Sequence, residues 1–340
     1  MSEPSHVLLS INDLSVRFAT AAGTADAVAS LSFAIEEGET LAIVGESGSG
    51  KSVSALAIMG LVPNPPGRVT SGQIVFRRRN GSTEDLLRAS SARLRDIRGN
   101  EIAMVFQEPL AALSPVFTIG EQIAESLRLH QRKSHADAMR MAVRMLGSLG
   151  ISEPEMRARS YPHQISGGMA QRVMIAMAMA CRPRLLIADE PTTALDVTIQ
   201  AEILSLIRQM KEETGMAVLF ITHNLGVVAQ IADRVAVMYA GRLVEEGPTK
   251  QIFSSPRMPY TSGLLASVPR LVTDDSPLVL SAIPGEPPSP LAHPRGCAFH
   301  PRCRYAVKGL CDTTPPPLRD LGNGQAARCL RIDEIVGGAT

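Results

Sequence analysis

Short apolar segments alternate with amphipathic helical segments along most of the chain. Leu41–Val44 and Leu185–Ala188 are continuous apolar runs, which are typical of buried parallel strands. Ala136–Leu149 has apolar residues every three or four positions, which predicts a helix with one apolar face. A similar pattern follows Asp196, and another apolar strand follows at Ala217–Thr222. This alternation of strand and helix predicts an α/β core.

Other segments have the patterns of edge strands and of a hairpin. Apolar and polar residues alternate over Leu8–Phe18 and, less regularly, over Ala27–Ile35, as expected of strands at the edge of a sheet. Val235–Tyr239 and Leu243–Glu245 are joined by a short turn containing Gly241. They predict a hairpin that closes the α/β domain.

The pattern changes near Ser255, where we place a domain boundary. Between Thr273 and Gly296, six prolines preclude a regular helix or a central strand. We therefore predict an α/β domain over residues 1–255, with a helical part at about 108–180, and a small irregular module over residues 256–340.

Composition excludes several classes of protein. A chain of 340 residues with 45% hydrophobic residues can bury a full core and is not intrinsically disordered. Its net charge of +1 gives little field for attracting nucleic acid, so no nucleic-acid partner is expected. The longest apolar run, Val173–Cys181, has nine residues, whereas roughly 20 are needed to span a bilayer. Because Met1–Ser10 shows no secretory signal, we expect a cytosolic protein.

A phosphate-binding loop follows the first apolar strand. The motif G-x-x-x-x-G-K-[ST] lies between the strand Leu41–Val44 and the helical run Ser52–Leu61, which is the context that it requires. Backbone N–H groups and the helix start would bind the phosphates, Lys51 would bridge them, and Ser52 would ligate Mg²⁺. The predicted nucleotide-binding residues are Gly45, Glu46, Ser47, Gly48, Ser49, Gly50, Lys51 and Ser52.

Two carboxylates end the strand Leu185–Ala188. Asp189 stands where an acidic group should hold the water shell of Mg²⁺. Because side chains alternate along a strand, Glu190 points elsewhere and is the candidate general base for the attacking water. Such a pair alone is as often a solvated strand end, but together with the phosphate loop it favours catalysis.

The segment Ser166–Arg172, with the sequence SGGMAQR, resembles the signature loop of the ATPase subunits of ABC transporters. Ser166, Gly167 and Gly168 open a helix, and their N–H groups suit a γ-phosphate presented from outside the chain. In this family a phosphate loop and a signature loop of one chain do not close on one nucleotide. The resemblance therefore implies that two subunits enclose ATP head to tail.

The resemblance also assigns roles to four further residues. Gln107 resembles the Q-loop glutamine that contacts Mg²⁺ and senses the membrane partner, and Asp196 belongs to a D-loop that crosses the dimer interface. His223 stands where the family places a switch histidine against the γ-phosphate. Phe18 is the candidate aromatic for stacking on adenine, or else a core residue of its strand.

Three segments resemble the dipeptide, oligopeptide and nickel importer branch of this family, namely Tyr161–Gln164, Pro259–Thr261 and Gly296–Cys303. The resemblance implies an ABC-type P-loop ATPase core with a helical subdomain, which hydrolyses ATP to drive solute uptake. The implied partners are a second ABC ATPase subunit, two integral membrane permeases and an extracytoplasmic solute-binding protein. The implied location is peripheral, at the cytoplasmic face of the inner membrane.

Four cysteines are clustered near the C-terminus. Cys297, Cys303, Cys311 and Cys329 are separated by five, seven and seventeen residues, without the C-x₂-C pairs of a zinc ribbon. Resembling members of the importer branch carry a [4Fe-4S] cluster, so the resemblance implies such a cluster here. Zinc and free thiols stay open as alternatives. The fifth cysteine, Cys181, is expected to be a buried core residue.

Two other functions stay open from the sequence. A soluble ABC ATPase that acts on nucleic acid or ribosomes is disfavoured by the net charge of +1 and by the lack of a second tandem ATPase unit. In the other alternative, the cysteine module is a metal-binding regulator and the ATPase core is only a nucleotide-gated clamp.

Overall fold

Two compact units make up the chain in a computed structural model that describes residues 6–193, 196–268 and 282–337. The first unit comprises residues 1–9, 34–39 and 75–221. The second comprises residues 10–33, 40–74 and 222–340. Both units are therefore assembled from segments that are distant in sequence.

The first unit contains a parallel sheet of buried strands. Its strands β6 (Ile102–Val105), β7 (Leu185–Asp189) and β8 (Ala217–Ile221) lie in that order. Every residue of these strands is buried, as the apolar runs predicted for β7 and β8. The end of β4 (Gly67–Arg77) pairs antiparallel with β5 (Thr83–Asp85), and α2 (Ser91–Ile97) follows.

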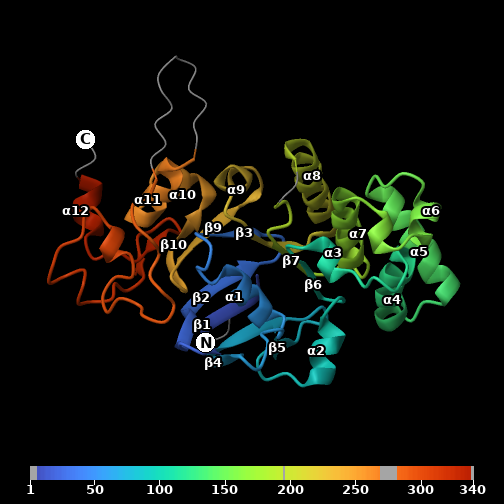
Figure 1. The fold of residues 1–340 in the computed structure, drawn as a ribbon, viewed down its shortest axis with the longest axis horizontal. Coiled ribbons are helices and arrows are strands. Elements are labelled where there is room, and N and C mark those ends of the chain that lie inside the picture. Colours follow the sequence, from blue (N-terminus) through green and yellow to red (C-terminus); the bar gives the residue numbers. More distant parts are fainter. Residues whose placement is uncertain (1–5, 194–195, 269–281, 338–340) are drawn as a thin grey trace, which may run out of the picture. The chain divides into compact units, whose positions relative to one another are not determined.

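Helices fill most of the stretch that was predicted to be helical. They are α3 (Pro109–Ala112), α4 (Ile119–Gln131), α5 (His135–Ser148), α6 (Pro154–Arg159) and α7 (Gly167–Met179), with a 3₁₀ turn at Pro162–Gln164. A capping box formed by Thr118 and Glu121 begins α4. Helices α4 and α5 pack against each other and against α6 and α7 (Figure 1). The long helix α8 (Val197–Thr214) ends at Gly215, whose φ of 67° lies in the left-handed region.

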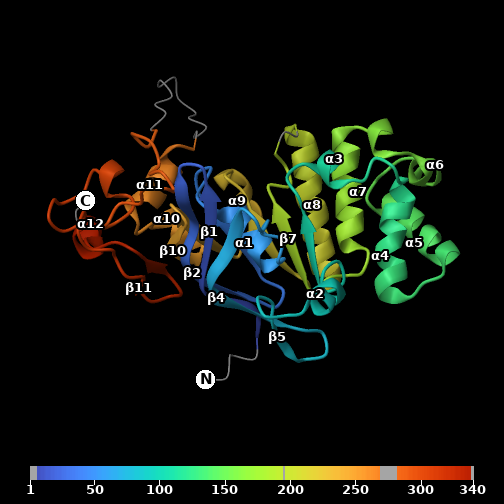
Figure 2. The same ribbon diagram turned by 60° about the horizontal axis from the view of Figure 1, so that its bottom comes forward.

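The second unit contains two groups of strands. Strands β2 (Gly23–Glu36), β1 (Val7–Thr20) and β4 lie in that order (Figure 2). In the other group, β3 (Thr40–Val44) pairs parallel with β9 (Arg234–Tyr239), which pairs antiparallel with β10 (Arg242–Pro248). The predicted hairpin is confirmed, and its first strand lies between β3 and β10. Helix α1 (Lys51–Ile58) follows β3, and α9 (Leu225–Ile231) precedes β9.

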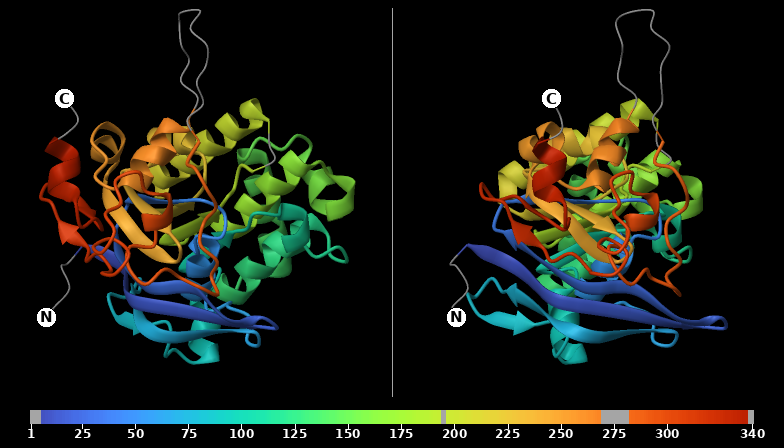
Figure 3. Two further views of the ribbon diagram at one scale, coloured as in Figure 1. Left: turned by 60° about the vertical axis from the view of Figure 1, so that its left-hand side comes forward. Right: turned by 90° about the vertical axis from the view of Figure 1, so that its left-hand side faces the viewer.

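The C-terminal region of the second unit packs against this hairpin. Its elements are α10 (Thr249–Ser254), α11 (Pro259–Ala266), a 3₁₀ turn at His300–Arg302, β11 (Arg319–Asp320), β12 (Ala326–Ala327) and α12 (Ile332–Gly337). Strand β12 pairs antiparallel with β10 and with β11. Figure 3 shows the remaining orange-to-red chain as irregular loops. Residues 273–281 of the proline-rich stretch lie outside the described residues.

An aromatic and aliphatic cluster joins the hairpin to the C-terminal region. The ring centroid of Tyr239 lies 4.5 Å from that of Tyr260 and 5.3 Å from that of Phe299, and Met258 and Val244 belong to the same buried cluster. This shared core places the C-terminal region in the same compact unit as β9 and β10. The compact units thus differ from the predicted domains 1–255 and 256–340, whose boundary stays a prediction.

Among residues 6–193, 196–268 and 282–337, no helix has both the length and the apolar character needed to span a membrane.

A buried carboxylate fastens the C-terminal region to β10. Glu245 is 0% exposed, and its Oε1 accepts hydrogen bonds from the Arg257 N–H at 2.6 Å and from Gln325 Nε2 at 3.0 Å. Its Oε2 accepts from the Met258 N–H at 3.0 Å. Burial raises the pKa of Glu245, and these donors oppose the rise because they favour the ionised form.

We predict that Glu245→Gln lowers the free energy of unfolding by about 1–3 kcal/mol, because an amide NH₂ would face N–H donors. Urea unfolding of the full chain measures the change. Asp333→Asn is the control, because Asp333 forms an exposed ion pair with Arg319, and its loss should cost less than about 1 kcal/mol. Equal stability of Glu245→Gln and the parent chain would contradict this role of Glu245.

Candidate nucleotide site

The predicted phosphate loop connects β3 to α1 in the second unit. Gly45 has a φ of 154° and Gly50 a φ of 98°. A Cβ on Gly45 would lie 2.2 Å from the Met238 carbonyl oxygen, and one on Gly50 would lie 2.4 Å from that of Ala27. Only glycine therefore fits at these positions. A Cβ on Gly48 would meet nothing within 4 Å, so the loop is closely packed at Gly45 and Gly50 and open at Gly48.

Lys51 folds back over the phosphate loop. Its side chain is buried, and Nζ donates to the carbonyl oxygens of Gly45 at 2.8 Å and Glu46 at 3.0 Å. The Ser49 carbonyl accepts from the Gly241 N–H at 3.0 Å, which ties the loop to the turn of the hairpin. Ser52 is the second residue of α1, at the helix end that favours anions. The geometry and chemistry of the loop residues thus fit a nucleoside triphosphate with Mg²⁺.

The predicted acidic pair lies at the end of β7 in the first unit. Asp189 is buried. Glu190 has a left-handed backbone with φ 47°, a conformation that costs energy in a residue other than glycine and is found at functional sites. Its Oε2 accepts hydrogen bonds from Gln107 Nε2 at 3.2 Å and Thr193 Oγ1 at 2.9 Å. The structure therefore brings Gln107 and Glu190 together and fixes the orientation of the Glu190 carboxylate.

The signature loop is an exposed helix start in the first unit. Ser166 is the N-cap of α7, and its hydroxyl accepts from the Met169 N–H at 3.3 Å. Ser166 and Gly167 are exposed, and a Cβ on Gly167 would meet nothing within 4 Å. The exposed N–H groups of this turn suit a ligand presented from outside the chain.

The start of α8 lies beside the signature loop. A Cβ on Gly168 would lie 3.5 Å from Ile199 Cγ2, and Figure 2 shows α7 and α8 side by side. Asp196 caps α8 by accepting from the Ile199 N–H at 2.9 Å. The next residue, Val197, is 81% exposed. The predicted D-loop covers Thr193–Asp196, and its residues 194 and 195 lie outside the described residues.

His223 and Phe18 belong to the second unit. His223 is exposed and follows Thr222, whose N–H donates to the Ile43 carbonyl at 3.2 Å. Phe18 is half-buried, and a Cβ on Gly67 would lie 2.6 Å from its Cε1. The ring thus packs against the backbone of β4. Its stacking on adenine stays a prediction, as does the contact of His223 with the γ-phosphate.

Two contacts at these residues were missed by the motifs. Thr193 follows Glu190 by three residues, so a turn after the acidic pair was a local signal that could have suggested it. Arg302 binds the carboxylate of Glu46, with Nη1 to Oε2 at 2.7 Å, across a sequence separation of 256 residues. No motif spacing predicts that second contact.

The four C-terminal cysteines line one small cavity with Phe299 and His300. Burial, with a smaller contribution from the other three thiols, raises the pKa of Cys297 to about 11. Their soft sulfur donors suit iron or zinc chemically. Yet within residues 6–193, 196–268 and 282–337 no group of three or more His, Cys, Asp or Glu side chains is arranged to hold a metal ion. The structure thus gives no support to the implied [4Fe-4S] cluster.

Comparisons with known proteins agree with the predicted fold class. A family model described as ABC transporter matches residues 28–193, and one described as the oligopeptide/dipeptide transporter C-terminal region matches residues 244–311. The chain is 50% identical over 333 residues to a putative peptide import ATP-binding protein of Brucella melitensis, covering 96% of this chain and 98% of the relative. It is 47% identical over 335 residues to the oligopeptide transport ATP-binding protein OppD of Salmonella typhimurium, covering 98% and 97%.

A similar solved structure is the dimeric ATP-binding cassette MJ0796 in a post-hydrolysis state bound to ADP and Pi. It is 28% identical and aligns with a TM-score of 0.63 over 71% of this chain and 99% of that chain. The fold of an ATP-binding cassette thus extends over most of the present chain.

We predict that Glu190→Gln keeps nucleotide binding but lowers ATP turnover by about 100-fold or more, because the general base is lost while the phosphate loop is unchanged. Phosphate release measures turnover, and titration with ATP measures binding. Glu155→Gln, which changes an exposed carboxylate at the start of α6, should leave both unchanged. Turnover near that of the parent chain would remove Glu190 from its catalytic role.

Proposed function

Because this chain belongs to the ABC transporter family and carries the C-terminal region of oligopeptide/dipeptide transporters, we propose that it hydrolyses ATP to drive peptide import. The observation that carries this proposal is the phosphate loop, in which Gly45 and Gly50 lie against the backbone and Lys51 is buried over the carbonyls of Gly45 and Glu46. Near-full-length similarity to peptide import proteins supports transport over action on nucleic acid or ribosomes.

The proposed chemistry divides binding from catalysis. Lys51 and the loop N–H groups would bind the phosphates, and by the family resemblance Ser52 and Asp189 would hold Mg²⁺, with Gln107 contacting the ion. Bound Mg²⁺ neutralises charge that develops on the γ-phosphate. Glu190, oriented by hydrogen bonds from Gln107 and Thr193, would deprotonate the attacking water.

The rest of the nucleotide site is proposed to come from a second ATPase subunit. Ser166, Gly167 and Gly168 would bind the γ-phosphate of the nucleotide held by the partner, while Asp196 crosses the interface. Support comes from the exposure of Ser166 and Gly167 and from the 81% exposed Val197 next to Asp196. His223 is proposed to contact the γ-phosphate from its own subunit, and Phe18 to stack on adenine.

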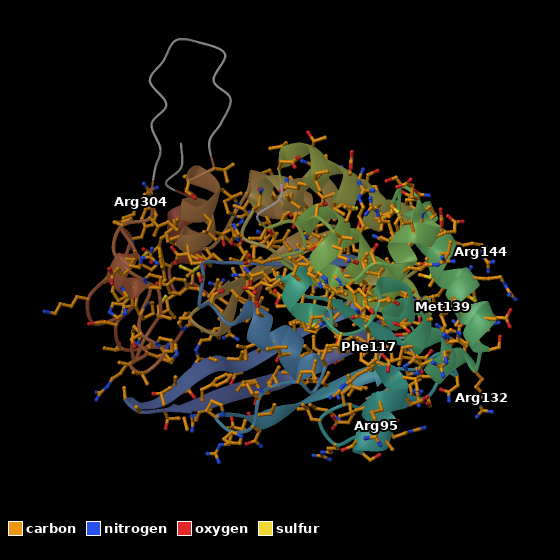
Figure 4. All side chains as sticks on the ribbon, turned by 45° about the vertical axis from the view of Figure 1, so that its right-hand side comes forward. Arg95, Phe117, Arg132, Met139, Arg144 and Arg304 are labelled. Carbon is orange, nitrogen blue, oxygen red and sulfur yellow. The ribbon has the colours of Figure 1, made fainter. Side chains whose placement is uncertain are left out.

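Transport requires membrane partners. We propose that the chain binds two integral permeases at the cytoplasmic face of the inner membrane, with solute delivered by an extracytoplasmic binding protein. Figure 4 labels Phe117, which lies with Val116 between α3 and α4. Phe117 is 55% and Val116 72% exposed, and Leu110 of α3 is 50% exposed. These apolar side chains follow Gln107 closely in sequence, which supports contact between this segment and a membrane partner.

For the C-terminal cysteines we propose that Cys297, Cys303, Cys311 and Cys329 hold a [4Fe-4S] cluster. The proposal rests on the family resemblance, and the four thiols that line one cavity are the groups that would hold the cluster. A bound cluster would supply a covalent cross-link and hence folding energy for a region with little regular structure.

We predict that the isolated chain hydrolyses ATP slowly, with a specific activity that rises with protein concentration, because each site needs a second subunit. Val197→Glu should lower this activity further by placing a charge at the interface, while ATP binding by the monomer is unchanged. Leu129→Glu, at a 69% exposed position of α4, is the matched control. Full activity in a strict monomer would contradict the shared site.

We predict that anaerobically purified protein is brown and carries about four irons per chain. Replacing any one of the four cysteines by serine should bleach the colour and increase cleavage of the C-terminal region by protease, while nucleotide binding stays within about tenfold. Cys181→Ser, in the first unit, should keep the colour. Zinc, or a colourless metal-free protein, would end the cluster proposal without affecting the ATPase assignment.

A further inference from the structure

Glu46 of the phosphate loop is held at three points. Its carbonyl oxygen accepts from Lys51 Nζ at 3.0 Å, its backbone N–H donates to the Tyr260 hydroxyl oxygen at 2.9 Å, and its carboxylate binds Arg302. We propose that Arg302 and Tyr260 are positioning residues for nucleotide binding, so that the C-terminal region sets the conformation of the phosphate loop. This inference rests on the proposed function, since it concerns the same nucleotide site.

The contact between Arg302 and Glu46 has a defined geometry. Nη1 donates to Oε2 at 2.7 Å and Nη2 to Oε1 at 2.9 Å, the parallel arrangement that makes arginine–carboxylate pairs directional. The side chain of Arg302 is 4% exposed and that of Glu46 is 26% exposed. A lysine has no planar fork and would not reproduce this pair of bonds.

Arg302 is itself fixed by the C-terminal region. Its Nε donates to the Pro284 carbonyl at 2.9 Å, and its guanidinium lies 5.9 Å from the ring centroids of both Tyr239 and Phe299. Tyr260, the other contact of Glu46, comes from α11 and packs against the same two rings. The two side chains that hold Glu46 thus belong to one aromatic cluster and would move together.

The position of Lys51 depends on this arrangement. Its ammonium is held by the carbonyls of Gly45 and Glu46, and a rotation of the Glu46 peptide would displace one of these acceptors. Glu46 does not act on the phosphates through its own N–H, because Tyr260 accepts that bond. Its role, and that of Arg302, is therefore to hold the backbone that places Lys51 and the following N–H groups.

The experiment compares nucleotide binding by full-length variants with a non-hydrolysable ATP analogue and Mg²⁺. Arg302→Met keeps an unbranched apolar stem but removes the charge and both bonds to Glu46. We expect about tenfold weaker binding, the size of a lost hydrogen bond to a charged group. In the protein assembled with its partners, KM for ATP should rise by a similar factor while kcat changes by less than about threefold.

Two further variants separate positioning from a general loss of folding. Glu46→Gln changes the phosphate-loop side of the ion pair. The double variant Glu46→Gln/Arg302→Met should bind the ATP analogue no more weakly than Arg302→Met alone, because both changes remove the same interaction. Arg302→Lys keeps the charge without the fork, and its affinity should be intermediate. If Arg302→Met does not fold, this lysine variant and Glu46→Gln carry the test.

Arg304→Met is the matched control. Arg304 is two residues away, is exposed at the surface of the C-terminal region (Figure 4) and contacts Tyr305, so its loss should leave affinity unchanged. The inference is overturned if Arg302→Met binds like the parent chain, if the effects of the two single changes add, or if Arg304→Met weakens binding equally. Failure of the parent chain to bind any nucleotide would instead overturn the proposed function.

Discussion

The shape of the phosphate loop depends on close contact between its glycines and the backbone of neighbouring strands. At Gly45 the Met238 carbonyl leaves no room for a Cβ, and at Gly50 the Ala27 carbonyl does the same. The carbonyls come from β9 and β2, so both groups of strands in the second unit bear on one short loop. The turn at Gly241 adds a hydrogen bond to Ser49. The arrangement of these strands therefore places the backbone groups that the loop packs against.

Motifs and periodicity predicted the features that depend on residues close together in the sequence. The apolar runs at β3, β7 and β8 and the helical pattern at α5 were identified because burial on all sides, or on one face, leaves a periodic trace. The phosphate loop was identified because its glycines and lysine are contiguous. The resemblance assigned Gln107 to Mg²⁺, and the strand pattern assigned Glu190 to the attacking water; the structure adds the hydrogen bond that joins the two side chains.

The C-terminal region was less predictable for physical reasons. Strands of two residues, such as β11 and β12, are too short to show any alternation. The prolines between residues 273 and 296 exclude a regular helix, but they do not indicate where the loops pack. The contact of Arg302 with Glu46 joins residues that no local rule connects, and the left-handed backbone of Glu190 is imposed by tertiary structure on a residue that rarely adopts it. Residues 256–340 were predicted to form a separate module, and part of this region shares a core with the hairpin; the domain boundary stays a prediction.

Strand β12 covers the open side of β10 over Glu245 and Glu246. An uncovered strand of this kind presents unpaired N–H and C=O groups to any other chain with a free strand. Within the described part of the protein, β12 of the C-terminal region thus pairs with this stretch of β10. A shortened chain that ended after β10 would lose both the pairing with β12 and the hydrogen bond from Gln325 to Glu245. The edge of β10 would then be unpaired, beside a buried carboxylate with fewer hydrogen-bond donors. Such a chain should aggregate more readily than the full chain, in addition to losing the contact of Arg302 with the phosphate loop.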